Sequence, residues 1–148
     1  MFKTLKNALL GSKSEDQFPQ WNVPMTLIFN QLPFCGLDPI QLAEAMENEE
    51  FALGYVFGMA DMANYQFGSH GGDQSQSLGY IQKVFTETLG SRADKLLQLA
   101  LNSQASGMFQ KGREIGANEL GEWIQSSGQN IPLGLSRQLG HPPFQRPT

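Results

Sequence analysis

The segment 51–60, FALGYVFGMA, constrains the fold of this chain more than any other stretch. Its ten residues carry no charge and are apolar on every side of a helix. A helix without a polar face lies inside a protein and is packed from several directions. We therefore expect an all-α domain whose central, buried, glycine-containing helix begins at Phe51 and ends near Gly68.

Start signals and apolar spacing place further helices on both sides of this segment. Asp38-Pro39 is typical of a helix start, because the aspartate accepts bonds from the first backbone N–H groups and proline suits the first helical position. Ser91, with Asp94 three residues later, resembles a capping box and predicts another start. One face of the helix between them is marked by Leu78, Ile81, Phe85 and Leu89. These patterns predict a compact bundle of about five helices.

The segment from Arg92 to Gln125 keeps helical periodicity but is too long for one helix of a compact domain. An unbroken helix of this length would measure about 51 Å. A compact domain of this size is only about 40 Å across. The segment therefore either breaks, with Ser106-Gly107 as the best position, or projects and binds a partner. We favour the break.

The ends of the chain have weaker patterns, and we take residues 1–148 as a single domain. Residues 1–20 are expected to form an N-terminal helix and a loop. The helix carries Phe2, Leu5 and Leu9 on one face with lysines nearby, and it either docks on its own domain or lies on a membrane surface, for which it is too short and too weakly charged. Residues 129–148 contain four prolines and are expected to be an irregular tail.

The segment before Asp38 is apolar but interrupted. Pro24, Pro33 and Gly36 exclude a long regular element there. Met25–Phe29 is either one short strand or a helical turn. Packing against the helices is the expected use of this segment.

Two parts of the sequence share a pattern at an offset of 58 residues. Phe51, Gly54, Gly58 and Asp61 align with Phe109, Gly112, Gly116 and Glu119. Glycine costs a helix about 1 kcal/mol relative to alanine, and a close approach of two backbones can offset that cost. We therefore predict that the four glycines are helix-packing positions. The pattern indicates either a duplicated helical hairpin, with its glycine helices crossing at a pseudo-symmetric centre, or coincidence in a chain with 16 glycines.

Charge and composition argue against several classes of partner. The formal net charge is −4, and the ten Lys and Arg residues are scattered, which argues against nucleic acid. No segment approaches the roughly 20 apolar residues of a membrane span, and the first ten residues lack the apolar run of a signal peptide. We therefore expect a cytoplasmic protein without a membrane partner. Charged residues make up only 16% of the chain, which favours self-association.

Asp61, Glu114 and Asn118 are the candidate ligand-binding residues. Asp61 follows the uncharged segment on the same helix, so partial burial could make it a general base; otherwise it is a structural carboxylate bonded to backbone or an arginine. Glu114 and Asn118 are four residues apart and share a helix face. Together with Asp61 they could hold a divalent cation, or they form a solvated face.

No residue is predicted to be catalytic, and neither a metal site nor a cofactor is expected. His70 and His141 are isolated from each other, and Cys35 is the only thiol. Cys35 lies among apolar neighbours, where a free cysteine is usually buried rather than nucleophilic.

No motif in the sequence identifies a chemistry, so the function cannot be read from it directly. The leading hypothesis is a non-enzymatic helical interaction module, homo-oligomeric or bound to another protein. The alternative is a small-molecule-binding protein or an enzyme with a pocket near Asp61 and Glu114.

Overall fold

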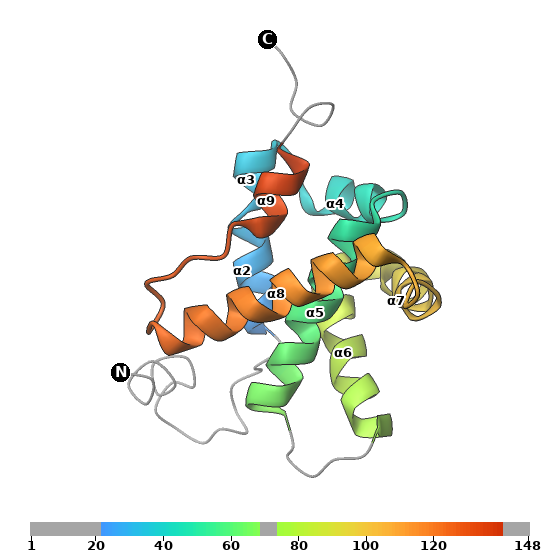
Figure 1. The fold of residues 1–148 in the computed structure, drawn as a ribbon. Coiled ribbons are helices and arrows are strands. Elements are labelled where there is room, and N and C mark those ends of the chain that lie inside the picture. The colour runs from blue at the N-terminus through green and yellow to red at the C-terminus, as the bar shows by residue number, and fades with distance from the viewer. Residues whose placement is uncertain (1–21, 69–73, 141–148) are drawn as a thin grey trace.

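In the computed structural model, residues 22–68 and 74–140 are described, and this part of the chain is helical and contains no strand (Figure 1). This confirms the predicted all-α fold. The α-helices are α2 (Asn22–Phe29), α3 (Leu32–Cys35), α4 (Pro39–Met46), α5 (Glu50–Phe67), α6 (Gln74–Leu89), α7 (Ala93–Asn102), α8 (Gly107–Gln125) and α9 (Gly134–Leu139). A 3-10 turn, η2 (Gly90–Arg92), joins α6 to α7.

Helix α5 is the central element of the fold. Every residue from Phe51 to Ala60 is buried, and the helix ends at Phe67 with Gly68 as its C-cap. The other helices surround it, and α8 crosses it near the middle of both helices (Figure 1). The central buried helix predicted from the uncharged segment is therefore present; it begins one residue before the predicted Phe51 and ends at Phe67, next to the predicted Gly68.

The crossing of α5 and α8 brings the two backbones into direct contact at the glycines. A Cβ atom added to Gly54 would overlap the carbonyl oxygen of Phe109, and one added to Gly58 would overlap that of Arg113. Helix α8 therefore lies where side chains of α5 would otherwise stand. No larger residue fits either position without separating the helices.

The same contacts occur with the two helices exchanged. A Cβ on Gly112 would overlap the carbonyl oxygen of Phe51, and one on Gly116 would overlap that of Tyr55. The Gly112–Phe51 contact corresponds to Gly54–Phe109 by the offset of 58 residues, and Gly116–Tyr55 corresponds in the same way to Gly58–Arg113. The crossing is thus pseudo-two-fold, with all four glycines at the contact, as predicted. An origin by duplication remains a prediction.

The long helical segment breaks where the sequence favours a break. Helix α7 ends at Asn102, and α8 begins at Gly107 with Ser106 as its N-cap, whose hydroxyl accepts a bond from the Phe109 N–H at 3.3 Å. The Ser106 hydroxyl also donates to the Glu50 carboxylate at 2.6 Å, which ties the start of α8 to the start of α5.

Two helix starts differ in their outcome. Asp38 caps α4 as predicted, accepting from the Gln41 N–H at 2.8 Å while the Gln41 side chain accepts from the Asp38 N–H at 3.0 Å. The predicted capping by Ser91 is wrong. Ser91 lies inside η2, and the N-cap position of α7 is Arg92, which makes no side-chain capping bond. The 3-10 turn continues directly into α7, so no extended residue is available there to act as a cap.

The segments that contain prolines hold more helix than the sequence predicts. Met25–Phe29 lies in α2, which settles the choice between strand and helical turn, and Pro24 and Pro33 lie in first turns, where proline costs no hydrogen bond. The predicted irregular tail is wrong for Gly134–Leu139, which form α9. The predicted helix of residues 1–20 lies outside the described residues.

Candidate functional site

Asp61, the first predicted site residue, is bound to an arginine. Its carboxylate accepts a bond from Nη2 of Arg113 at 3.2 Å. The same guanidinium donates to the side-chain oxygen of Gln104 at 2.9 Å and lies over the ring of Phe57, 5.1 Å from its centroid. Asp61 thus has the partner that a structural carboxylate requires.

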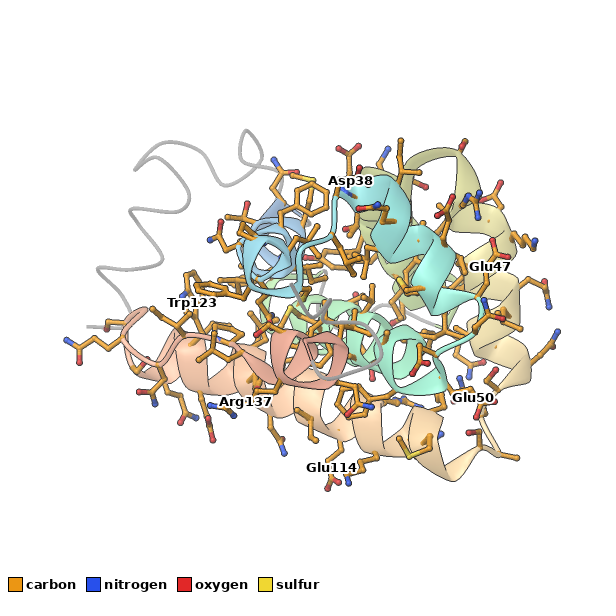
Figure 2. The ribbon with its side chains drawn as sticks, turned by 90° about the horizontal axis from the view of Figure 1, so that it is seen from above. Asp38, Glu47, Glu50, Glu114, Trp123 and Arg137 are labelled. Atoms are coloured by element: carbon orange, nitrogen blue, oxygen red, sulfur yellow. The ribbon has the colours of Figure 1, made fainter. Side chains whose placement is uncertain are left out.

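Glu114 and Asn118 lie exposed on α8, where they share a hollow with Arg113 of this ion pair but not with Asp61. Figure 2 shows Glu114 pointing outward from α8. Both residues line a hollow of about 420 Å³ whose other lining residues also come from α8, so it is a depression along one helix, and Asp61 is not among its lining. In the described ranges no three His, Cys, Asp or Glu side chains lie close enough to hold a metal ion. A ligand pocket near Asp61 and Glu114 remains a prediction.

The Asp61–Arg113 pair has a counterpart at the other end of the crossing. The hydroxyl of Tyr55 donates to the Glu119 carboxylate at 2.5 Å. Tyr55 corresponds to Arg113 and Glu119 to Asp61 by the offset of 58 residues. Each glycine helix therefore carries, after its first glycine, a side chain that binds the acidic residue of the other helix.

The Tyr55–Glu119 end is closed by a polar network that holds α9. Gln31 donates to the Tyr55 hydroxyl at 2.9 Å and accepts from the Ser136 N–H at 3.0 Å. Glu119 also accepts from the Gly134 N–H at 2.9 Å. Because these bonds satisfy the first backbone N–H groups of α9, a segment preceded by proline can form a helix here.

Tyr55 is held in its protonated form. Burial, followed by the negative charge of Glu119 and the hydrogen bond to it, raises the pKa of Tyr55 far above its ordinary value. Tyr55 is 0% exposed and Gln31 is 1% exposed, so no substrate reaches this hydroxyl. The network is a structural clamp rather than a site of chemistry.

Cys35 is not an activated nucleophile. It is buried, its Sγ donates to the Gln31 carbonyl oxygen at 3.5 Å, and burial raises the pKa of the thiol. Because the thiolate is the reactive form, this environment keeps the residue inert.

A groove lies between α2, α4 and the α6–η2 junction, and all three elements contribute to its lining. We call it the α2–α4–α6 groove. Its volume is about 550 Å³, within the range typical of ligand pockets. Its lining residues are Phe29, Pro39, Ile40, Ala43, Glu87, Thr88, Leu89, Gly90, Ser91 and Arg92. The lining is thus mainly apolar, with charged residues at the η2 side.

Two side chains of the groove are poorly satisfied by the chain itself. Thr88 is 3% exposed, and its buried hydroxyl has no hydrogen-bond partner among the described residues. Ile40 is a large apolar side chain that is 68% exposed. A buried hydroxyl without a partner is uncommon in folded proteins, and here it occurs beside an exposed isoleucine in the same groove.

The charge at the η2 side of the groove is already paired. Arg92 binds Glu47 at 2.6 Å and approaches Glu44 at 3.6 Å. Lys95 also binds Glu47, at 3.4 Å. An anionic ligand would have to compete with two carboxylates for Arg92, which makes the groove poorly suited to anions.

Sequence reasoning did not identify the groove. Ile40 stands at helical spacing from Ala43, a pattern typical of the buried face of a helix, yet the structure leaves it exposed. Thr88 lies inside a helix next to apolar residues and gives no signal that its hydroxyl lacks a partner. Only the packing of α2 and α4 against α6 creates the hollow.

Comparison with known proteins gives no assignment. No family model matches the sequence, and neither a curated protein nor a solved structure matches it. Among the described residues, no helix combines the length and the apolar character that crossing a membrane requires.

Proposed function

We propose that this chain is a non-enzymatic helical interaction module and that the α2–α4–α6 groove is its binding surface. The observation that carries this proposal is the buried Thr88 hydroxyl, which has no hydrogen-bond partner at the wall of a mainly apolar groove. An unsatisfied buried hydroxyl costs about 1–3 kcal/mol. A partner removes that cost if its binding uncovers the hydroxyl and brings it a hydrogen-bond acceptor.

The lining supports a protein segment as the partner. The exposed Ile40 and the half-buried Phe29 offer apolar surface to apolar side chains, and the buried Ala43 and Leu89 form the wall behind them. Amphipathic helices commonly bind in this way, with anchors one turn apart in an apolar groove. The bound partner of the groove is either another protein or a second copy of this chain.

A homodimer and a cytoplasmic location belong to the same proposal. With 16% charged residues, repulsion between copies is weak. Native mass spectrometry of the full chain measures the subunit number, and cell fractionation measures the location. A strictly monomeric protein recovered outside the cytoplasm would contradict both parts.

The groove is tested with Ile40→Glu, which places a charge on its apolar surface. Helical peptides selected from a displayed library for binding to the wild-type chain should bind this variant at least about tenfold more weakly, because burying an unpaired carboxylate costs well over 1 kcal/mol. Fluorescence anisotropy measures the affinity.

Ile131→Glu is the matched control. Ile131 is also exposed, at 65%, but does not line the groove, so its substitution should leave the affinity unchanged. Selected peptides that bind Ile40→Glu as tightly as the wild type would refute the proposal, as would a library that yields no binder to a monomeric wild-type chain.

A further inference from the structure

A second hollow lies between the first half of α6 and the end of α7, and we call it the α6–α7 hollow. Its volume is about 530 Å³, and its lining residues are Gln74, Ser75, Ser77, Leu78, Ile81 and Leu101. Leu78 and Leu101 are 41% and 38% exposed, so two large apolar side chains are left partly uncovered at one place. Apolar side chains that gather at the surface mark a contact site more often than single ones do.

The lining of this hollow differs in charge from that of the other two. Glu87 and Arg92 line the α2–α4–α6 groove. Arg113 and Glu114 line the depression along α8. The described residues that line the α6–α7 hollow include no charged residue, and their polar groups are hydroxyls and an amide. A partner recognised by its charge has no counter-charge to bind in this hollow.

The uncharged surface continues from the hollow along α6. Five exposed residues at spacings of three and four share one side of the helix, and we call them the α6 seam: Ser75, Leu78, Gly79, Gln82 and Thr86. The charged residues of α6, Lys83 and Glu87, lie to one side of the seam. Asp73, which precedes the helix, lies outside the described residues. The middle of the seam is therefore free of charge.

Gly79, in the middle of the seam, lowers the stability of α6 without a compensating contact in the described chain. Glycine inside a helix is about 1 kcal/mol less favourable than alanine. At Gly54 the backbone of α8 lies where a Cβ would stand, whereas a Cβ added to Gly79 would meet no atom within 4 Å. The bare backbone at Gly79 thus resembles one side of a close helix crossing.

A second copy of this chain suits the surface best. In a two-fold contact the same face of both subunits meets, so residues near the axis approach their own copies. A charged residue there would meet a like charge, whereas a hydroxyl or an amide both donates and accepts hydrogen bonds and can pair with its own copy. The hollow and the seam contain glycine and apolar, hydroxyl and amide side chains only. They are therefore complementary to themselves.

We infer that the chain forms a two-fold dimer in which α6 crosses α6 of the second copy near Gly79, with Leu78 and Leu101 covered at the contact. This inference rests on the proposed function, because it gives the proposed homodimer a surface of its own. Thr88, in the α2–α4–α6 groove, is nine residues from Gly79, or about 14 Å along α6. The groove thus remains open to a different partner in the dimer.

Sedimentation equilibrium of the full chain tests the inference with three glutamate substitutions of exposed apolar residues. Leu78→Glu places two like charges at the contact and should raise the dissociation constant of the dimer at least about tenfold. Ile40→Glu, in the groove, and Ile131→Glu, outside both surfaces, should leave it unchanged. A wild type that is monomeric at every concentration, or a dimer that Leu78→Glu leaves intact, would overturn the inference.

Gly79→Ala tests the close approach of the two helices. The added methyl group should favour α6 in the separate monomer and still weaken the dimer several-fold, because it holds the two α6 helices apart. A dimer that this substitution leaves unchanged or strengthens would overturn the crossing at Gly79.

Spin labels test the geometry of the contact without adding charge. A label on Gln82→Cys lies on the seam, and one on Ile131→Cys lies in the α8–α9 connection, on the other side of the molecule from α6 (Figure 1). Cys35 is buried, so the label reacts with the introduced thiol. Dipolar spectroscopy of the dimer should give a shorter separation between the two labels for Gln82→Cys. A shorter separation for Ile131→Cys would assign the dimer to another face and overturn the inference.

The outcomes separate this inference from the proposed function. A dimer that Ile40→Glu dissociates and Leu78→Glu does not would place the second copy in the groove, which removes the inference and keeps the groove as a binding surface. A dimer that Leu78→Glu dissociates, together with a groove that binds no selected peptide, supports the inference and removes the groove as the binding surface.

Discussion

The α5–α8 crossing and the α2–α4–α6 groove bring helices together in opposite ways. At the crossing, glycine removes the side chains and the backbones touch, so no space remains. At the groove, the side chains of three helices leave about 550 Å³ between them. One chain thus contains a contact where a single methyl group cannot be added and a surface where a whole side chain can enter. The first holds the fold together, and the second is the surface that we propose for binding.

The largest effect is expected from Gly54→Ala. The added Cβ overlaps the backbone of α8, so the helices must separate, and we expect a loss of about 3 kcal/mol in the free energy of unfolding. The matched control is Gly79→Ala in α6, where a Cβ meets no atom within 4 Å. This variant should be stabilised by about 0.5–1 kcal/mol. Urea denaturation measures the free energy of unfolding of both variants. Equal changes would contradict the conclusion that the crossing requires glycine.

Alkaline pH tests the buried tyrosines next. Burial raises the pKa of both Tyr55 and Tyr80, so above pH 10 the unfolded chain loses protons that the folded protein keeps. The free energy of unfolding is therefore at its full value below pH 10 and decreases above it. The decrease at pH 11 is about 1.4 kcal/mol per tyrosine. Tyr55→Phe should reduce this decrease by about half. A stability that does not change between pH 9 and pH 11 would contradict the burial of both hydroxyls.

The two polar ends of the crossing should differ in strength. Tyr55→Phe removes a buried hydroxyl from Gln31 and Glu119 and should cost about 1–3 kcal/mol. Asp61→Asn weakens an ion pair whose side chains are 42% and 34% exposed, so it should cost less than about 1 kcal/mol. Thermal or urea unfolding of the two variants measures the difference. A larger effect of Asp61→Asn would reverse our assignment of the stronger end.

The smallest effect is expected at the groove and has the opposite sign. Thr88→Val replaces an unsatisfied buried hydroxyl by a methyl group of similar size, so the free protein should become more stable by about 1 kcal/mol. Binding of selected peptides should weaken at the same time, because their acceptor loses its donor. Destabilisation by this substitution would mean that the hydroxyl already has a partner.

The parts of the fold that depend on local spacing could be predicted from the sequence. The uncharged run identified α5, and glycines four residues apart identified both sides of the crossing. The prolines on both sides of Gly134–Leu139 hid α9. The groups that satisfy its first N–H groups are Glu119, 15 residues from Gly134, and Gln31, 105 residues from Ser136. Hydrogen-bond partners so distant in the chain produce no periodic pattern in the sequence.

In the candidate site, too, only the features that depend on local sequence could be predicted. Asp61 could be recognised as a residue in need of a partner, and the possible arginine was foreseen without identifying Arg113. The groove could not be predicted at all, since Ile40 and Thr88 look like ordinary helix positions until α2 and α4 pack against α6.

The unequal ends of the crossing give the molecule a preferred direction of motion. At the Tyr55–Glu119 end the tyrosine hydroxyl is buried and Glu119 also binds α9, so water replaces a broken bond less readily than at the more exposed Asp61–Arg113 end. Transient separation of α5 and α8 should therefore begin at the more exposed Asp61–Arg113 end, while the Tyr55–Glu119 end stays in contact. The backbones of the two helices are related almost symmetrically, but their side chains make the pair open from one end only.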